Sequence, residues 1–317
     1  MTTKDILVLT MVKGIGPATL KKYLYRLKFD VDYNNLIKEL KPTELEFTHI
    51  YEKNADRIIS TCKNEGIDII DITSCSYPAS LIEITTPPAI LYVKGNKNLL
   101  TKTTIAIIGT RNSSKLGNQI AERLGQYFSQ HFAICNGLVE GIDEHSVYIN
   151  NKTLPNVIGI ISGGLCYQST CSRNHIRMIE DVLSNNGLLI SEFPPMKKED
   201  QYSGSTSSRI QAGLSTAIIL VQSKLDGGSK YTFDKFVKLG RIIGVVDFSS
   251  NPEFKEELFE ANRIILRERE HGIAKFVGLK TDKSLKIKSI VPIASKDDYL
   301  IFEKEITTST LTNLFDC

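Results

Sequence analysis

Eight short apolar runs between residues 66 and 247 constrain the fold of this chain more than any other feature. In order they read GIDIIDI, AILYVKG, TIAIIG, HFAICNG, VIGIISGG, GLLISEF, AIILVQS and RIIGVVD. They lack the clean alternation of half-exposed strands, which indicates strands buried on both faces of a mainly parallel sheet. Helical stretches lie between several of them, such as the one that places Leu116, Ile120 and Leu124 on one face. The sequence therefore predicts an α/β fold with a doubly wound, mainly parallel sheet.

The segment before these runs has a helical pattern. Leu20, Leu24 and Leu27 follow a Gly-Ile-Gly-Pro turn at helical spacing. Two helices around such a turn resemble a helix-hairpin-helix, whose turn amides can hold a DNA phosphate. The alternative is a tight turn that only packs a small helical domain, and we favour it because a single hairpin is present.

Three regions follow from these patterns. We assign residues 1–66 to a small helical, helix-hairpin-helix or SAM-like domain. Residues 67–282 form the α/β domain, and residues 283–317 form a C-terminal tail or edge strand that is too short for a full winged helix.

The composition is that of a soluble globular protein, with 41% hydrophobic and 24% charged residues. Lysine and arginine outnumber aspartate and glutamate by only 39 to 36, so any affinity for nucleic acid must depend on where individual charges lie. No apolar stretch is long enough to span a membrane and no signal cleavage site is evident, so we expect a cytoplasmic protein with no membrane partner.

The six cysteines include no C-x-x-C pair. Cys166, Cys171 and His175 are near one another in the chain, but a fourth ligand is missing and the spacing matches no zinc module. We therefore expect reduced, unligated thiols, no metal site and no cofactor.

Glycine-bearing loops follow four strands of the predicted sheet. Ligands of open parallel sheets bind beyond the carboxyl ends of the strands, and glycine lets a phosphate approach the backbone closely. Strand-to-helix turns also favour glycine for geometry alone, so the prediction of a binding edge depends on all four loops together. The loop residues that we select are Gly109, Thr110, Arg111 and Ser114 (with Ser113 as the alternative helix N-cap), Asn136, Gly137 and Gly141, Gly163 and Gly164, and Gly228, Ser229 and Lys230.

The first loop differs from a dinucleotide-binding loop. Its sequence GTRNSS supplies one glycine and the cation of Arg111, where a G-x-G-x-x-G motif has further glycines. A phosphate ligand with a need for positive charge is therefore indicated, rather than a nicotinamide or flavin dinucleotide.

Catalytic motifs are missing from the sequence. There is no G-x-S-x-G elbow, no Walker lysine motif and no H-E-x-x-H. Asp143, Glu144 and His145, with Glu192 at the end of its strand, could perform acid–base chemistry. Acidic residues at a helix start also stabilise the helix through its dipole without any catalytic role. We predict no enzymatic activity and no catalytic residues.

An ordered series of motifs over roughly residues 10–250 resembles the family of DNA-processing proteins called DprA or Smf. The series consists of GIGP near the N-terminus, SYPASLIEITTPPAILYVKGN, G-x-R-x-x-S-x-x-G from Gly109 to Gly117, NGLVEGID, ISEFP, RIQAGLS, GGSKYTF and GRIIGVV. The resemblance implies a Rossmann-like domain that binds single-stranded DNA, with Arg111 facing a backbone phosphate. It also implies a homodimer that protects incoming strands in natural transformation, loads a RecA-type recombinase and is not an enzyme. To the loop residues above it adds Gly117, Asn174, Arg209 and Gly213 as binding positions.

The chain departs from the family pattern at several charged positions. Of the basic motif F-P-x-R-N-R only Arg209 remains, with Ser207 and Ser208 in place of an arginine and an asparagine. Glu140 replaces the arginine before G-I-D, and Thr170-Cys171 replaces a Tyr-Pro pair ahead of Asn174. Each lost phosphate contact lowers the salt dependence of single-strand binding by about 0.7, so we expect weakened binding.

Other side chains could compensate for these losses. The candidate cations are Lys115, Arg173, Lys230 and Lys235. Bases could stack on Tyr202 or Tyr231, although we favour ordinary partial burial for both rings.

Two other functions stay open on the same scaffold. A sensor of nucleotide derivatives, in a defence or stress system, would suit a site with few basic residues, and Glu140 favours it. A nucleoside-monophosphate hydrolase would need a P-G-G-x-G-T-x-x-E signature, which DGGSKYTFDKF, with Asp234, matches poorly.

Overall fold

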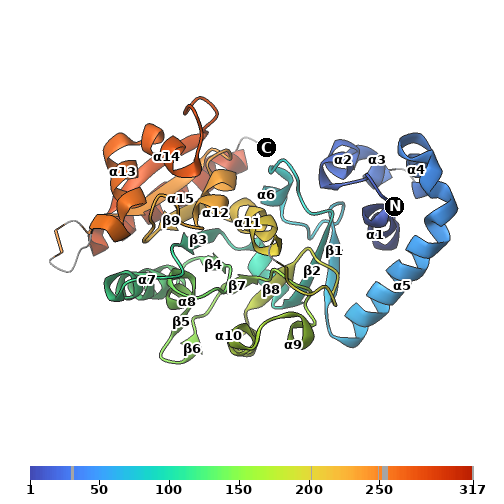
Figure 1. The fold of residues 1–317 in the computed structure, drawn as a ribbon, viewed down its shortest axis with the longest axis horizontal. Coiled ribbons are helices and arrows are strands. Elements are labelled where there is room, and N and C mark those ends of the chain that lie inside the picture. The colour runs from blue at the N-terminus through green and yellow to red at the C-terminus, as the bar shows by residue number, and fades with distance from the viewer. Residues whose placement is uncertain (30–31, 201, 249, 252–255, 316–317) are drawn as a thin grey trace.

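The computed structural model describes residues 1–29, 32–200, 202–248, 250–251 and 256–315. Within them, one large sheet carries helices on both faces, and a group of N-terminal helices packs against its β1–β2 end (Figure 1).

The large sheet has nine strands in the described part of the chain, in the order β1-β2-β8-β7-β4-β3-β9-β10-β11. Every neighbouring pair from β8 to β11 is parallel, whereas β2 runs antiparallel to both β1 and β8. Each of the eight apolar runs forms one strand, so the prediction of a doubly wound, mainly parallel α/β fold is confirmed. The bounds are β1 (Asp68–Asp71), β2 (Ile90–Gly95), β3 (Thr104–Ile108), β4 (Ala133–Asn136), β7 (Val157–Ile160), β8 (Leu188–Ser191), β9 (Ala217–Leu220), β10 (Arg241–Val246) and β11 (Ile287–Ile293), with β5 (Tyr148–Ile149) and β6 (Lys152–Thr153) forming a separate hairpin.

The helices are described in three groups, in chain order. The N-terminal group is α1 (Thr3–Met11), α2 (Pro17–Lys22), α3 (Leu24–Phe29), α4 (Tyr33–Leu40) and α5 (Thr48–Asn64), with the 3₁₀ turn η1 (Pro42–Phe47). The middle group is α6 (Ala79–Ile82), η2 (Lys97–Thr101), α7 (Lys115–Phe128), α8 (Ile142–Val147), α9 (Tyr167–Thr170), α10 (Arg173–Ser184) and α11 (Ser203–Leu214). The last group is α12 (Lys230–Phe236), η3 (Glu256–Leu258), α13 (Glu260–Glu268), α14 (Glu270–Val277) and α15 (Lys296–Phe315). In the described part of the chain no helix is both long and apolar enough to cross a membrane.

The central strand β3 shows why the sheet needs cover on both faces. Ala106 and Ile108 join the cluster that contains Phe233 of α12, while Ile105 and Ile107 join the cluster that contains Phe128 of α7. All five side chains of β3, including that of Thr104, are buried. Since neighbours in a strand point to opposite faces, an uninterrupted apolar run is stable only between two layers of helices.

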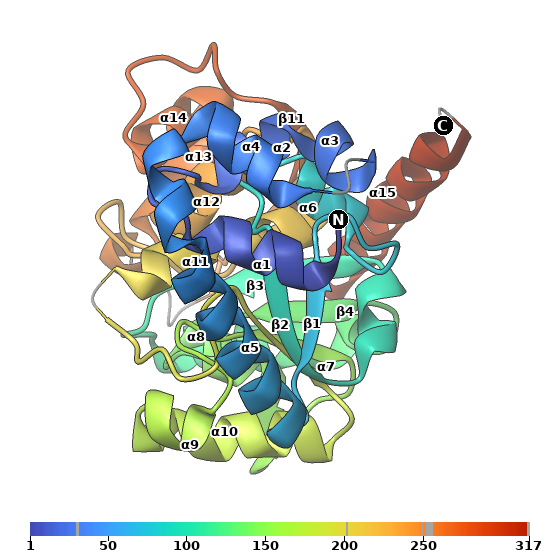
Figure 2. The same ribbon diagram turned by 90° about the vertical axis from the view of Figure 1, so that its right-hand side faces the viewer.

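The N-terminal helices are attached through polar as well as apolar contacts. Figure 2 shows α1 and α5 lying over β1 and β2. Lys21 on α2 donates to the carbonyl of Ile84 at 2.7 Å, and Thr3 on α1 donates to Asp71 at 2.6 Å. The helices are therefore fixed to the α/β part through both the β1 strand and the segment that follows α6.

The strand order reverses at β3, and this sets the position of the ligand site. From β3 the chain moves outward through β4, β7 and β8, and it then returns to place β9 on the other side of β3. The crevice beyond the carboxyl ends at such a switch point is where open α/β sheets bind their ligands.

Candidate functional site

A cavity of about 720 Å³ lies at this switch point. Residues of the loops after β3, β4, β7 and β9 line it, together with residues of α10, α11 and α12. This volume is typical of pockets that enclose most of a small ligand. We call it the carboxyl-end cavity.

Arg111 stands in the wall of the carboxyl-end cavity with its side chain exposed. Among the residues that the structure describes, its guanidinium has neither a hydrogen bond nor an ion pair. Its charge is felt locally, since it favours ionisation of the neighbouring Asp143. The guanidinium is thus available to an anion in the cavity.

The backbone around Arg111 is held by the loop after β4. Gly141 has a φ of +82°, and a side chain there would collide with the carbonyl oxygens of Thr110 and Arg111. The next residue, Ile142, donates its amide to the carbonyl of Thr110 at 3.2 Å. Gly141 is required at this position because it permits both the positive φ and the close approach of the two loops.

A second anchor comes from the end of β9. The buried Gln222 accepts from the amide of Ser114 at 3.0 Å and from its hydroxyl at 3.1 Å. Ser114 in turn accepts from the amide of Gly117 at 3.1 Å and is therefore the N-cap of α7. Of the two serines that the sequence suggested as the cap, Ser114 takes this role, but it does not line the cavity.

Six of the predicted binding residues do line the cavity. Gly228 is exposed and has no atom within 4 Å of the position where a side chain would begin, so a ligand can approach its backbone. Ser229 is 8% exposed, and its hydroxyl lies 2.8 Å from that of Ser223. The full set is Gly109, Thr110, Arg111, Gly137, Gly228 and Ser229.

Three predicted residues are placed in the protein interior, which corrects their assignment as binding residues. Asn136 is fully buried, and its side chain donates to the carbonyl of Asp143 at 2.9 Å. Gly117 lies beneath the side chain of Gln222, and Gly213 packs against α6. These residues shape the loops and the core rather than contact a ligand.

The loop after β7 corrects two further assignments. Gly163 and Gly164 are buried under the segment 194–199, and the amide of Gly164 donates to the carbonyl of Lys197 at 2.7 Å.

Two predicted residues on helices also lie outside the cavity lining or the described side chains. Lys230 does not line the cavity, and its ammonium group lies 5.7 Å from the centre of the Tyr231 ring. Asn174 belongs to the first turn of α10, and its side chain lies outside the described part of the structure.

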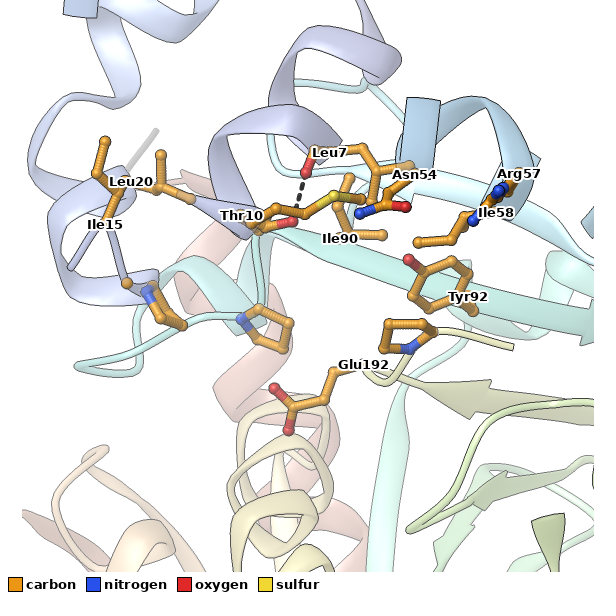
Figure 3. A pocket seen from close by; sticks show the side chains of 16 residues that line it. Leu7, Thr10, Ile15, Leu20, Asn54, Arg57, Ile58, Ile90, Tyr92 and Glu192 are labelled. Atoms are coloured by element: carbon orange, nitrogen blue, oxygen red, sulfur yellow. Dashed lines mark hydrogen bonds between the residues drawn. The ribbon is translucent and has the colours of Figure 1, made fainter. Parts of the chain in front are cut away.

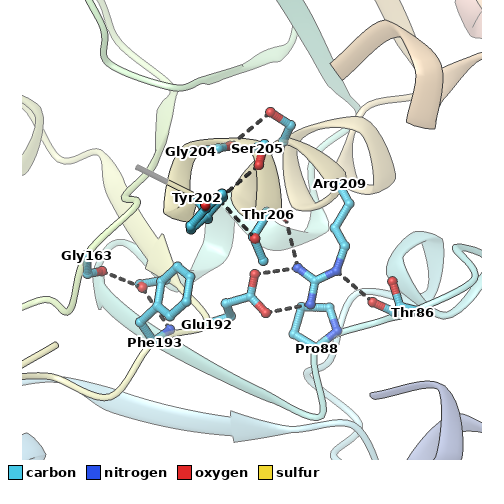
Figure 4. A network of polar contacts seen from close by, with 12 residues as sticks. Thr86, Pro88, Gly163, Glu192, Phe193, Tyr202, Gly204, Ser205, Thr206 and Arg209 are labelled. Atoms are coloured by element: carbon cyan, nitrogen blue, oxygen red, sulfur yellow. Dashed lines mark hydrogen bonds and ion pairs between the residues drawn. The ribbon is translucent and has the colours of Figure 1, made fainter. Parts of the chain in front are cut away.

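The prediction that Arg209 contacts DNA is also corrected by its surroundings. It is 9% exposed, and its two terminal nitrogens bind both carboxylate oxygens of Glu192 (Figure 4). Its Nε donates to the carbonyl of Thr86 at 2.9 Å. All of the guanidinium's strong partners are therefore within the protein, and Arg209 joins α11 to the end of β8 instead of facing a ligand.

The carboxyl-end cavity holds more acidic than basic side chains. Arg111 and His175 line it together with four acids, Glu140, Asp143, Glu199 and Asp200. Asp200 is paired with Lys197 at 2.6 Å, and hydrogen bonds from Lys197 and Ser203 hold its pKa far below the usual range. The cations that could have compensated, namely Lys115, Arg173, Lys230 and Lys235, are not among the lining residues.

Asp143 is the acid whose ionisation the fold controls most strongly. The residue is 7% exposed, and burial raises its pKa to about 7. The amide of Gly137, which donates to its Oδ2 at 3.2 Å, and the charge of Arg111 oppose this rise only in part. Near neutral pH this carboxyl group is therefore charged in only part of the molecules.

Two polar residues of α11 in the cavity wall were missed by the sequence reasoning. Ser207 is 4% exposed, and its hydroxyl has no partner among the described residues. Gln211 is 5% exposed and donates to the carbonyl of Cys135 at 3.2 Å. Ser207 had been considered only as the loss of an arginine, and no sequence signal shows that α11 turns this position toward the cavity.

Aromatic and sulfur side chains also lie near the cavity. Tyr231 is 52% exposed and lines the cavity, so this ring is partly buried as expected, whereas Tyr202 is more open at 69%. Cys171 and His175 line it as well, and burial raises the pKa of Cys171 to about 11. Across the described ranges, no group of three or more histidine, cysteine, aspartate or glutamate residues is placed to hold a metal ion.

A second cavity, of about 560 Å³, separates the N-terminal helices from the sheet (Figure 3). Its lining is mostly apolar and includes Leu7, Ile58 and Tyr92. Gly16 and Pro17 of the GIGP turn face this cavity, which favours the packing interpretation of that turn over a phosphate-binding hairpin. Glu192 reaches the cavity from the opposite side, with its carboxylate engaged by Arg209.

These features define a doubly wound α/β protein with a ligand cavity at its topological switch point and a free arginine in the cavity wall. The chain belongs to the family described as DNA recombination-mediator protein A, whose profile matches residues 68–269. The resemblance that the motif series suggested is therefore confirmed.

Curated relatives carry the names of the same family. The chain is 34% identical over 203 residues to DNA processing protein DprA of Bacillus subtilis, a stretch covering 63% of this chain and 67% of that protein. It is 30% identical over 167 residues to DNA processing protein DprA of Streptococcus pneumoniae, covering 52% and 57% of the two chains. Protein Smf of Escherichia coli is 30% identical over 182 residues, covering 55% and 46%. The matched stretch is thus about half to two thirds of each relative.

Two solved structures share the fold. The X-ray structure of DNA processing protein A from Streptococcus pneumoniae matches with a TM-score of 0.73 and 22% identity, over 95% of this chain and 98% of that one. DNA processing protein A from Helicobacter pylori, studied for its single-stranded DNA binding mode, matches with a TM-score of 0.54 and 23% identity, over 64% and 88%. The first match extends over the N-terminal helices as well as the sheet.

The buried Arg209–Glu192 pair predicts a specific stability pattern. We expect Arg209→Leu to lower the free energy of unfolding by about 3–5 kcal/mol, because it leaves Glu192 buried without a counter-charge. Arg209→Leu combined with Glu192→Leu should recover most of that loss. Thermal or urea unfolding of the parent, both single variants and the double variant measures this. A double variant no more stable than Arg209→Leu would contradict the assignment of the pair.

The raised pKa of Asp143 predicts a dependence of stability on pH. Its pKa of about 7 in the folded state exceeds the ordinary aspartate pKa of 3.8, so the folded state retains a proton that the unfolded chain releases between these values. The free energy of unfolding should therefore fall as the pH rises from about 4 to 7. Asp143→Asn keeps an acceptor for Gly137 without the charge. The difference in free energy of unfolding between the Asp143→Asn protein and the parent should grow in favour of the variant across this window, on the order of a few kcal/mol. Melting temperatures that change in parallel for both proteins would rule this out.

Proposed function

We propose that this protein binds single-stranded DNA at the carboxyl-end cavity and acts there as a non-enzymatic recombination mediator. The observation that carries the proposal is the exposed guanidinium of Arg111, which stands without a protein partner in the described structure at the switch point of the sheet. Membership of the recombination-mediator family supports the same assignment. Delivery of the strand to a RecA-type recombinase and action as a homodimer are the parts of the proposal that follow from the family alone.

The contacts that we propose are an ionic contact with a phosphate, a close approach to the protein backbone, and stacking on an aromatic ring. Arg111 binds a backbone phosphate, since a guanidinium offers a fixed fork of donors to phosphate oxygens. The exposed backbone at Gly228 lets the sugar-phosphate chain approach without meeting a side chain. Tyr231, half exposed beside it, offers a ring on which a base can stack.

The acids of the cavity limit the affinity of this single site. Glu140 is exposed among the lining residues and repels phosphate, although Asp143 is only partly ionised near neutral pH. We therefore propose weak binding per cavity with a salt dependence of about one phosphate contact, that is, a slope near 0.7 for each contact.

Substitution of Arg111 tests this proposal directly. Arg111→Glu should weaken binding of labelled oligo-dT by about 10- to 100-fold, because a charge-assisted contact is replaced by repulsion. Glu140→Arg should strengthen binding for the converse reason. Fluorescence anisotropy at two salt concentrations gives the affinity and the slope for each protein.

Lys63→Glu is the matched control for this titration. It makes the same change of charge at the exposed end of α5, outside the cavity. An Arg111→Glu protein that binds oligo-dT as well as the Lys63→Glu protein would remove the proposed role of the cavity.

A nucleotide sensor is the second candidate, and the acid-rich lining of the cavity favours it. A volume of about 720 Å³ can enclose a nucleotide-sized ligand, whose charge is smaller than that of a polymer. A hydrolase is less well supported, because Asp234 of its partial signature is paired with Lys235 and Lys238 and does not line the cavity.

Thermal-shift measurements separate the sensor from the DNA-binding protein. A ligand that binds the folded state raises the melting temperature in proportion to the logarithm of its concentration. We expect oligo-dT to raise it and mononucleotides and cyclic nucleotides to leave it unchanged. A shift with a nucleotide, and none with oligo-dT, would select the sensor.

A further inference from the structure

Two aromatic rings on α3 face the solvent together. Tyr25 is 76% exposed and Phe29 is 66% exposed, two of the three highest values among the large hydrophobic residues of the described structure. Their ring centroids are 4.7 Å apart. Leu27, on the other side of the same helix, is fully buried and anchors α3 to the N-terminal core. The exposed rings are thus held on a fixed helix and are not needed for its attachment.

Exposed cations flank these two rings in the sequence. Lys22 and Lys28 are exposed, and within the described ranges neither has a carboxylate partner. Arg26, which lies between the two rings in the sequence, pairs with Glu39 at 2.5 Å. In the sequence, residues 13–41 contain seven lysines and arginines (13, 21, 22, 26, 28, 38 and 41) against three acids (30, 32 and 39). This balance differs from that of the carboxyl-end cavity, where acids outnumber cations.

Exposed aromatic rings among unpaired lysines match one kind of partner best. A protein partner would favour an apolar patch with few lysines, because lysine is depleted at protein interfaces. Proteins that bind single strands without sequence preference combine cations for the phosphates with rings on which bases stack. The charge of this surface is complementary to a nucleic acid and not to a second copy of the same basic surface.

We infer that Tyr25, Phe29, Lys22 and Lys28 form a second contact surface for single-stranded nucleic acid, which we call the α3 platform. The inference rests on the proposed function for the polymer, but its residues are separate from those of the cavity. Bases stack on the two rings, and the lysine ammonium groups hold the adjacent phosphates.

The position of the α3 platform allows one strand to use both surfaces. Lys21, on the neighbouring α2, is bonded to the carbonyls of Glu83 and Ile84, while Arg209 of α11 is bonded to that of Thr86. The segment after α6 therefore joins the platform side of the molecule to the helix that lines the cavity (Figure 1). A strand that leaves the cavity along α11 can continue toward α3.

Removal of the two rings tests the α3 platform. Tyr25→Ala combined with Phe29→Ala should weaken binding of a long oligo-dT by about 5- to 100-fold, the effect of losing stacking of about one base. A short oligo-dT that can occupy only the carboxyl-end cavity should bind as it does to the parent. Phe47→Ala, which removes a 40% exposed ring on η1, is the matched control and should change neither titration.

A leucine variant keeps this test independent of folding. Tyr25→Leu with Phe29→Leu retains an apolar contact along the helix but removes both ring faces, so it should melt like the parent and lose the same affinity. Long oligo-dT binding at parental affinity by the leucine variant would overturn the platform.

A direct optical readout is possible because the chain has no tryptophan. In Phe29→Trp the new ring is the only tryptophan, and its fluorescence should be quenched by oligo-dT with the midpoint seen in anisotropy. An unchanged emission, or a Tyr25/Phe29 variant that alters self-association but not DNA binding, would overturn the inference.

The two proposals fail in different ways. If Arg111→Glu binds long oligo-dT like the parent while the Tyr25/Phe29 variants lose it, the cavity proposal fails and the platform is supported. If the ring variants bind like the parent while Arg111→Glu does not, the platform fails and the cavity proposal is supported.

Discussion

The close approach of two loops at Gly141 is the constraint on which the candidate site depends. The positive φ of this residue and the lack of a side chain bring the loop after β4 against the carbonyls of Thr110 and Arg111. Because β3 and β4 are parallel neighbours, both loops begin at the same edge of the sheet. On the other side of the Arg111 loop, the side chain of Gln222, which follows β9, accepts from the amide of Ser114. The position of one cation is thus set by three strands that are distant in sequence, which is how a rigid sheet gives precision to loop residues.

The strands could be predicted because each apolar run carries its own signal, and buried parallel strands need nothing else to be recognised. The loops on the ligand edge followed from the same reasoning. What could not be predicted was which loop residues stay open to a ligand. Arg209 and Glu192 are separated by 17 positions and meet only when α11 packs beside β8, and Gly164 is covered by a segment that follows a later strand. Tertiary partners decide these outcomes, and no local pattern records them.

Burial and ion pairing also change the effective charge of the acidic residues that line the cavity. A count of lining residues gives four acids against Arg111 and His175, a poor balance for binding a polyanion. Asp143 is driven toward its neutral form by desolvation, and Asp200 is neutralised by Lys197. The charge that a phosphate would meet is therefore closer to that of Arg111 opposed by Glu140 and Glu199. A site of this kind can position a strand, but it supplies little of the attraction that long polymers use.

The arrangement of the whole molecule offers a physical answer to that weakness. A second surface, formed by Lys22 at the end of α2 and by Lys28 and two exposed rings on α3, occurs on a helix group that Lys21 and Thr3 attach to the sheet side. Since both proposed surfaces belong to one molecule, a strand held at one would meet the other at a raised effective concentration, and two weak contacts would multiply. The arginine that Ser207 replaces in the motif at α11 could then be offset without being restored. Selection on such a protein would act on the sum of the two surfaces, which leaves the cavity free to acquire acids such as Glu140 as long as the α3 platform keeps its rings and lysines.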